Sequence, residues 1–240
     1  MHSHNDLNQL KDFGLINNAS LFPQGVINID FEDSKFIKNQ FNISDKKIIA
    51  SYGFLLPHKG VKELIQVFGD LISRYPHLHL LLINALYPIH DSIQLRDECL
   101  QLIKKMKLSK NITMINDYLT NQESILLLKC ADIIIFPYQN TQESSSAAVR
   151  HGIASRKPVV CTPLPIFDDV NSIVHILPGT SPHQIHSGLL ALLDDENLLL
   201  SKTERQKEWI NNHSWDVLSK RLQNIIQSLK NNDVEKSIDL

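Results

Sequence analysis

The sequence predicts an α/β fold in which a doubly wound parallel sheet is followed by C-terminal helices. From Lys47 onward, short apolar runs alternate with longer segments of helical periodicity. Strict alternation of strands and helices implies parallel strands joined by right-handed crossovers. Several of the runs are apolar throughout, as expected for strands that helices cover on both faces. These observations together favour one large domain with a central parallel sheet.

The predicted strands are short apolar runs spaced along the middle of the chain. The first run, Ile48-Ile-Ala-Ser-Tyr-Gly53, ends in a glycine and leads into a loop that carries Lys59. The last run, 174–177, is a candidate sixth strand. The predicted strands span residues 48–53, 78–84, 112–116, 133–138, 159–162 and 174–177.

The predicted helices occupy the segments between these strands. In the first helix the apolar residues recur at helical spacing on one face, beginning with Val61, Leu64 and Ile65. Asp91 and Ser92 are possible caps of the second helix, and Ser181-Pro182 opens another in the expected order of cap and proline. The predicted helices span residues 61–75, 91–108, 121–130, 145–154 and 181–193.

The two ends of the chain depart from this alternation. Residues 1–28 hold at most one helix and one strand, too little for a core of their own, and residues 29–46 read as a connection. Residues 196–229 read as two helices separated near Ser214, which is a plausible cap for the second. The charged final residues, 231–240, form the expected frayed tail.

Composition narrows the class of protein. The chain has 240 residues, of which 42% are hydrophobic and 21% charged, as in ordinary globular proteins. A net charge of -2 argues against binding nucleic acid through bulk electrostatics. The three cysteines are isolated, with no metal-site or disulfide spacing, which favours a reducing compartment. We therefore expect a cytoplasmic protein without a signal peptide, a membrane span or a bound metal.

The segment 141–161 is the most informative part of the chain. It follows the fourth predicted strand and combines Glu143 with a cluster of three serines, Ser144, Ser145 and Ser146, at the start of a short helix. Hydroxyls and free backbone N–H groups at a helix start can bind an anion. The carboxylate beside them can accept hydrogen bonds from sugar hydroxyls. This combination suits a phosphorylated sugar.

The predicted topology places a second loop opposite this one. Ligands of open parallel sheets bind beyond the carboxyl ends of the strands, where the strand order reverses. For the common order 3-2-1-4-5-6, that point lies between the first and fourth strands. The loops after these strands carry Lys59 and Glu143. A diphosphate between them would gain a charge-assisted contact and several N–H donors.

Each of these residues also has a purely structural interpretation. Lys59 can be an exposed lysine in a turn, Glu143 can stabilise a helix dipole, and the serines can cap and turn the chain. Arg150 and His151 can be surface residues. Two further positions, Asn116 and Tyr118, end the third strand near the same rim and either contact a base or belong to an ordinary loop.

The pair Asp168-Asp169 resembles a metal-binding pair at first sight. It follows Pro163-Leu-Pro165, and the sequence around it offers no further ligands. We therefore interpret the pair as a helix N-terminus.

Taken in order, these motifs resemble the C-terminal, donor-binding domain of retaining glycosyltransferases of family 4. The resemblance runs from about residue 20 to 230 and includes Gly53, the pair Lys59-Gly60, Glu143 and the segment Lys157-Pro-Val-Val160. The segment Phe22-Pro-Gln-Gly-Val26 resembles the one that precedes the interdomain connection in that family. The resemblance implies half of a GT-B fold, which has two Rossmann-like domains facing a cleft.

The family implies a role for each matching position. Lys59 matches the lysine that contacts the donor diphosphate. Glu143 matches the first glutamate of a two-glutamate motif, and this first glutamate contacts the transferred sugar. Ser145, Ser146 and Ala147 match a segment whose backbone N–H groups bind the diphosphate. Such enzymes use nucleotide diphosphate sugars and generally need no metal or other cofactor in this domain.

The sequence departs from the family pattern at three places. Phe54 stands where the family often has an arginine, and Arg150 is a candidate replacement for that cation. The second glutamate of the motif, which usually holds the ribose, falls at His151. Most of the N-terminal domain, which carries the acceptor site, has no counterpart in the chain. The resemblance implies these units: 1–28 as a remnant of that domain, 29–46 as the interdomain connection, 47–213 as the nucleotide-sugar-binding domain, and 214–240 as a C-terminal helix and tail.

Two functions from different classes follow. The first is the donor-binding half of a hexosyltransferase for surface polysaccharide or glycolipid synthesis, inactive by itself and dependent on a separate or missing acceptor domain. Peripheral association with the inner face of the cell membrane stays open. The second is a non-catalytic nucleotide or nucleotide-sugar binding module, or a degenerate relic. A Rossmann oxidoreductase is disfavoured because no Gly-x-Gly-x-x-Gly follows the first strand.

Overall fold

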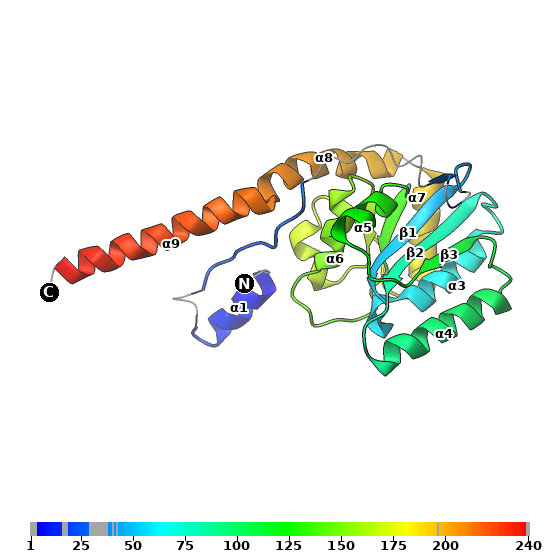
Figure 1. The fold of residues 1–240 in the computed structure, drawn as a ribbon, viewed down its shortest axis with the longest axis horizontal. Coiled ribbons are helices and arrows are strands. Elements are labelled where there is room, and N and C mark those ends of the chain that lie inside the picture. Colours follow the sequence, from blue (N-terminus) through cyan, green and yellow to red (C-terminus); the bar gives the residue numbers. More distant parts are fainter. Residues whose placement is uncertain are drawn as a thin grey trace.

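The computed structural model describes residues 4–15, 19–28, 38–39, 41, 43–195 and 197–238. Its centre is a six-stranded sheet in which all neighbouring strands are parallel (Figure 1). The strands are β1 (Lys47–Phe54), β2 (Leu78–Ala85), β3 (Ile112–Ile115), β4 (Ile133–Phe136), β5 (Val159–Cys161) and β6 (His175–Ile176). Their order in the sheet is β3-β2-β1-β4-β5-β6, the common doubly wound order that the sequence analysis assumed. The doubly wound α/β class is confirmed.

Strand β1 lies at the middle of the sheet and separates two buried clusters of apolar side chains. Its side chains alternate between the faces, so that Ile48 and Ala50 join one cluster and Ile49 joins the other. Strand β1 pairs with β2 along its whole length, and with β4 at Ile49 and Ala50. The end of β1 therefore lies between the ends of its two neighbours.

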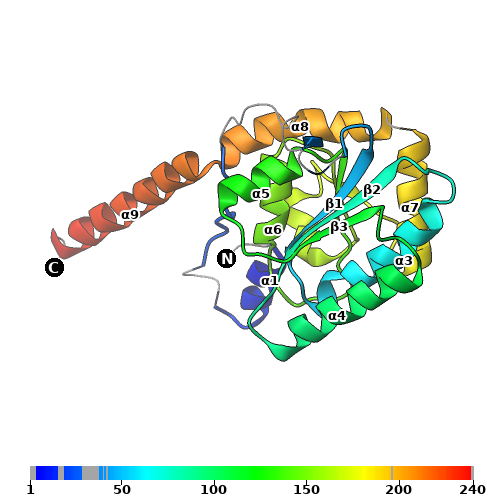
Figure 2. The same ribbon diagram turned by 45° about the vertical axis from the view of Figure 1, so that its right-hand side comes forward.

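Helices cover both faces of the sheet (Figure 2). Helices α3, α4 and α7 contribute to one cluster, and α5 and α6 to the other. Helix α8 contributes Leu199 to the first and Ile210 to the second, so it runs across the edge of the domain. The bounds are α3 (Val61–Leu71), α4 (His90–Lys105), α5 (Asn121–Leu128), α6 (Ala147–Ala154), α7 (Pro182–Asp194) and α8 (Asn197–His213).

The terminal segments meet beside α6. Helix α1 (His4–Asp12) precedes an extended segment in which the Val26 N–H donates to His213 O at 2.9 Å. Val26 also forms a bridge with Ser214, which separates α8 from α9 (Trp215–Ile238). Helix α9 projects away from the sheet (Figures 1 and 2). Of the predicted connection 29–46, residues 29–37, 40 and 42 lie outside the described residues.

Most predicted caps are confirmed, and one is wrong. The Ser181 side chain forms a capping box with Gln184, and Ser214 Oγ accepts from the Val217 N–H at 3.4 Å. Helix α4 begins at His90 after Ile89, which makes no side-chain cap. Ser92 is not a cap, because its hydroxyl donates to Leu55 O at 2.7 Å and fastens α4 to the loop after β1.

Candidate functional site

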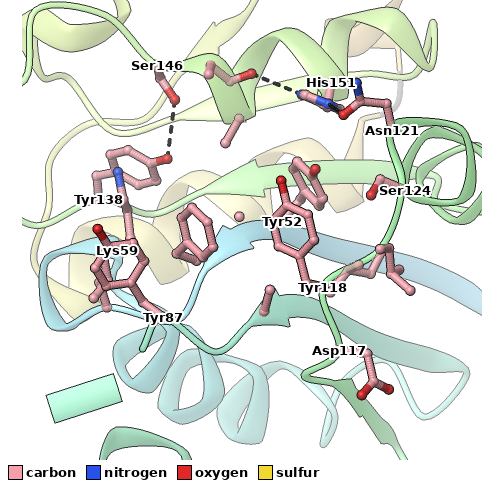
Figure 3. Close-up of a pocket in the computed structure, with 18 of the residues that line it drawn as sticks. Tyr52, Lys59, Tyr87, Asp117, Tyr118, Asn121, Ser124, Tyr138, Ser146 and His151 are labelled. Atoms are coloured by element: carbon pink, nitrogen blue, oxygen red, sulfur yellow. Dashed lines mark hydrogen bonds between the residues drawn. The ribbon is translucent and has the colours of Figure 1, made fainter. Parts of the chain in front are cut away.

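A cavity of about 490 Å³ opens at the carboxyl ends of β1, β2 and β4 (Figure 3). This is the point at which the strand order reverses, where open parallel sheets bind their ligands. Its lining comes from the loops after these strands, from the loop after β3, and from the starts of α5 and α6. The residues that line it include Tyr52, Gly53, Phe54, Lys59, Tyr87, Tyr118, Asn121, Tyr138, Glu143, Ser146, Ala147 and His151.

A tight loop after β1 presents Lys59 to the cavity. The short 3-10 helix η1 (Pro57–Lys59) starts at a proline. Gly60 is its C-cap and has a φ of 71°, which lies in the left-handed region. Glycine is required there for a second reason, because a Cβ would lie 1.9 Å from Pro137 O. The loop is thereby pressed against the chain that leaves β4. Both loops that the sequence singled out are held in contact by this junction.

Lys59 and Glu143 form the polar centre of the cavity. Lys59 Nζ lies 3.0 Å from Glu143 Oε2 and 4.1 Å from the centre of the Tyr138 ring. The lysine side chain is 12% exposed, whereas that of Glu143 is 48% exposed. Burial lowers the pKa of Lys59, although the pairing with Glu143 acts in the opposite direction. The ammonium group is therefore held in a partly desolvated place where a second anion would interact strongly.

His58 is a second neighbour of the same carboxylate. Its Nε2 lies 3.5 Å from Glu143 Oε1, at the limit of hydrogen-bond distance, and forms no hydrogen bond with it. Nε2 is buried and has no hydrogen-bond partner among the described residues. Burial and the charge of Lys59 lower the pKa of His58, against the effect of Glu143. The imidazole is thus favoured in its neutral form beside an anion.

The start of α6 forms one wall of the cavity. Ser146 is its N-cap, with Oγ accepting from the Val149 N–H at 3.3 Å. The hydroxyl of Tyr138 lies 3.3 Å from the same Oγ (Figure 3). Burial raises the pKa of Tyr138, which therefore stays neutral. The first-turn residues Ala147 and Ala148 line the cavity, and first-turn N–H groups lack acceptors within their helix.

The other end of the cavity is aromatic. The ring of Phe54 stacks with that of Tyr118 at 6.0 Å between centroids and meets Tyr87 edge to face at 5.0 Å. Tyr52 lies 5.0 Å from the ring of His151, a few residues along α6. The cavity therefore combines a cation and a helix N-terminus at one end with flat apolar surface at the other. Such a set suits an anionic ligand that carries a planar ring.

A family model described as glycosyl transferases group 1 matches residues 33–214, more than half of the chain. The chain belongs to this family. A D-inositol 3-phosphate glycosyltransferase from Corynebacterium glutamicum (strain R) is 26% identical over 182 residues, which cover 75% of this chain and 43% of that protein. The chain thus spans less than half the length of this relative.

Several solved structures share the fold of this chain. HepE of Anabaena, in complex with UDP, matches with a TM-score of 0.81 at 11% identity, over 95% of this chain and 62% of that one. The C-terminal domain of a glycosyl transferase group 1 family protein from Francisella tularensis matches with a TM-score of 0.61 at 18% identity, over 82% and 96%. These likenesses concern the GT-B fold of glycosyltransferases.

Arg150 of this glycosyltransferase domain does not face the cavity. Its side chain is 3% exposed and forms an ion pair with Asp169. The guanidinium also donates to Ser146 O at 2.8 Å and to Gln24 O at 3.3 Å. The expectation that Arg150 could replace the cation missing at Phe54 is therefore wrong. The positive charge of Arg150 is balanced by the carboxylate of Asp169.

Asp169 also differs from its predicted role. Asp168 lies in the first turn of the 3-10 helix η2 (Pro165–Val170), in line with the predicted helix N-terminus, whereas Asp169 follows it within the same helix. The carboxylate of Asp169 is the buried counter-ion of Arg150. Among the described residues, no group of three or more His, Cys, Asp or Glu could hold a metal ion.

The serine cluster divides between two surroundings. The Ser145 hydroxyl donates to Gln24 Oε1 at 3.1 Å, away from the cavity, and neither Ser144 nor Ser145 lines it. Ser146 and Ala147 do line it. The chain therefore presents the cap and first turn of α6 to the cavity, while Ser145 connects the segment before α6 to the N-terminal segment.

The third-strand pair divides in the same way. Asn116 donates from its side chain to Asn84 O at 2.8 Å, so it joins β3 to β2 and does not line the cavity. Tyr118, at 80% exposure, lies at the cavity rim (Figure 3). Of the two residues proposed to touch a base, only Tyr118 is in a position to do so.

His151 and Gly53 line the cavity as the sequence suggested. His151 has ring nitrogens 3.1 Å from Ala147 O and 3.0 Å from Asn121 Oδ1, and burial lowers its pKa. Gly53 has a φ of 125°, and a Cβ there would lie 3.3 Å from Ala148 Cβ. The glycine therefore allows α6 to approach the end of β1.

Sequence reasoning missed His58 and assigned no site role to Tyr52, Tyr87 or Tyr138. A signal was available for the tyrosines, because each lies within a few residues of the carboxyl end of a predicted strand. Such positions of a parallel sheet meet at one edge. His58 offered no comparable signal, because its position depends on the tight turn at Gly60.

In the part of the chain that the structure describes, no helix is both long enough and apolar enough to span a membrane.

Proposed function

We propose that this chain is the donor-binding, C-terminal half of a retaining family 4 hexosyltransferase that uses a nucleotide diphosphate sugar. The observation that carries the proposal is the Lys59–Glu143 pair beside the start of α6, inside the cavity at the strand-order reversal. HepE, whose fold this chain shares, has been solved with UDP and with UDP-glucose. The match to an isolated C-terminal domain supports the assignment to that half.

In this proposal the diphosphate binds between Lys59 and the first turn of α6. The ammonium group and the N–H groups of Ala147 and Ala148 stabilise the negative charge that develops on the leaving diphosphate. Because they are fixed before the ligand arrives, they need little reorganisation during the reaction. Glu143 orients the sugar through its hydroxyls, and the flat surface of Tyr118 receives the base.

The unit assignment stays part of the proposal. Residues 1–28 are the remnant of an acceptor domain, 29–46 the connection, 47–213 the donor domain and 214–240 a helix and tail. A donor site alone cannot align an acceptor, so the isolated chain has little or no transferase activity. The acceptor domain is supplied separately or in a longer protein, in the cytoplasm or at the inner face of the membrane, and the product is a surface polysaccharide or glycolipid. No cofactor is proposed, and the nucleotide diphosphate sugar is the substrate.

One observation favours a second function, a non-catalytic nucleotide or nucleotide-sugar binding module. Phe54 stands where the family often has an arginine, and His151 stands where it has a glutamate. Arg150 forms an ion pair with Asp169 and is not free to bind a ligand. The cavity therefore has fewer charged groups than the family pattern provides. A module that only binds would tolerate this loss better than an enzyme.

Calorimetric titration with UDP, GDP, ADP and their hexose conjugates tests the proposal. We expect saturable binding of one nucleotide sugar to the wild-type chain, weakened at least about tenfold by Lys59→Ala, since a charge-assisted hydrogen bond contributes about 1.5–3 kcal/mol. The matched control is Lys62→Ala, an exposed lysine of α3 that pairs with Glu98 outside the cavity. Equal effects of the two substitutions would refute the role of Lys59. Binding in which the sugar adds no affinity would favour the second function.

A further inference from the structure

A polar atom next to the site, Nε2 of His58, has no hydrogen-bond partner in the described structure, and the same holds for Ser124 Oγ in the cavity wall. Nε2 of His58 is buried and faces Glu143 Oε1 at 3.5 Å. Buried polar atoms in proteins almost always have a hydrogen-bond partner. A buried atom without one beside a ligand site therefore indicates that it gains its partner in another state of the site, such as the one with ligand bound.

His58 is held in place independently of Glu143. Its backbone carbonyl accepts from the Gln139 N–H at 2.9 Å, and it lies within η1 next to the fixed turn at Gly60. Its ring packs edge to face on Tyr138 at 6.4 Å between centroids. His58 is therefore held both by the loop after β1, to which it belongs, and by Tyr138 and Gln139 in the loop after β4.

Glu143 has two oxygens and two neighbours. Oε2 is taken by Lys59 at 3.0 Å, whereas Oε1 faces His58. A diphosphate that binds Lys59 competes with the Glu143 carboxylate for the same ammonium group. The carboxylate, half exposed on its loop, then loses its main partner and its orientation.

We propose that His58 is a positioning residue for Glu143, and that its Nε2–H donates to Glu143 Oε1 once a diphosphate draws Lys59 away. The inference rests on the proposed donor site and specifies how that site changes when it is filled. The neutral imidazole suffices, because its Nε2–H tautomer is a donor. His58 then keeps the carboxylate aimed at the sugar, so its effect falls on the sugar moiety and not on the nucleotide.

The test compares UDP with UDP-glucose by titration calorimetry on the full chain. The variants are His58→Ala, which removes the donor, and His58→Gln, whose side-chain NH₂ can replace Nε2–H. His183→Ala, exposed on α7, is the control. We expect His58→Ala to weaken UDP-glucose about fivefold, the value of one ordinary hydrogen bond, with UDP unchanged. His58→Gln should restore affinity to within about twofold.

The other outcomes overturn the inference. Equal weakening of UDP and UDP-glucose by His58→Ala would mean that the histidine only supports the loop, as would failure of His58→Gln to restore binding. If the wild-type chain binds UDP but gains nothing from the glucose, the inference fails while nucleotide binding stands. If the wild-type chain binds neither ligand, the donor-site proposal itself fails and the inference falls with it.

Discussion

Two cations near the site have opposite surroundings, and their neighbours determine what each can do. Lys59 faces the cavity, and its partner Glu143 is half exposed, so a ligand can reach both. Arg150 is buried, with Asp169 and two carbonyl oxygens around its guanidinium. Burial lowers its pKa, against the effect of Asp169. Lys59 can therefore serve a ligand, whereas Arg150 supports the fold.

Removing Arg150 tests its structural role. Arg150→Met leaves the Asp169 carboxylate without its cation in a place where water has little access. Breaking a buried ion pair costs about 3 kcal/mol or more. We expect this loss in the free energy of unfolding, measured by urea denaturation, and a smaller loss for the double variant with Asp169→Asn. The control is Arg96→Met on α4, where Arg96 pairs with the exposed Asp97. A change in Arg150→Met no larger than that in this control would contradict the account.

Sequence analysis found Lys59 and Glu143 because their types and places in the chain are informative by themselves. It could not place Arg150, since nothing in the local sequence indicates that Asp169 lies beside it across a strand and a loop. The same reason explains Asn116, whose partner Asn84 belongs to another strand. Burial and long-range pairing are properties of the folded chain.

At the scale of elements, the site depends on the contact between the loops after β1 and β4. Gly60 makes this contact possible, because its φ of 71° and the nearby Pro137 O leave no room for a side chain. The apolar character of β1 and β4 fixes the two strands side by side, and the turn then sets where Lys59 points. The cavity is thus a consequence of sheet topology and one glycine.

Replacing that glycine should disturb both stability and the site. Gly60→Ala combines a left-handed backbone position, which costs about 1–2 kcal/mol, with a contact against backbone that cannot be relieved by rotating a side chain. We expect a loss above about 2 kcal/mol, measured by urea denaturation. Gly14→Ala is the matched control, since Gly14 has the same φ of 71° but nothing within 4 Å of the added Cβ. Equal losses would contradict the importance of the Pro137 contact.

Elements were the easiest part to predict, because periodicity is a local property. The alternation of apolar runs with helical segments predicted six strands, and the structure has six. The common strand order of doubly wound sheets is also the observed strand order. The cap of α4 was wrong, because Ser92 bonds instead to Leu55 O, an acceptor in a distant loop. Local cap rules hold where no tertiary partner competes, as at Ser181.

At the scale of the molecule, burial of histidines makes stability depend on pH. Burial lowers the pKa of His58, His79, His151 and His175 below the ordinary value of about 6.5 in the folded chain. Below that pH the unfolded chain binds more protons than the folded one, so the free energy of unfolding falls as the pH drops. The contribution is complete above about pH 6.5 and is lost toward the lower folded-state values.

We therefore expect a lower Tm at about pH 5.5 than at about pH 7.5. Each kcal/mol lost from the free energy of unfolding lowers the Tm by about 2–4 °C. Thermal unfolding followed by circular dichroism measures the difference. His79 lies on β2 and its ring bonds to Thr113 of β3, so His79→Gln should reduce the difference, and the exposed His183→Gln should leave it unchanged. A Tm that does not fall at the lower pH would show that these histidines do not govern stability.

The central claim concerns the whole molecule: a diphosphate binds between Lys59 and the first turn of α6. Amide chemical-shift changes in a ¹H–¹⁵N spectrum of the full chain, recorded as UDP is added, test it most directly. The account predicts that the largest changes fall on Ala147, Ala148 and the loop around Gly60, and that Lys59→Ala needs at least about tenfold more UDP to produce them. Changes centred elsewhere, or none at saturating UDP, would contradict it.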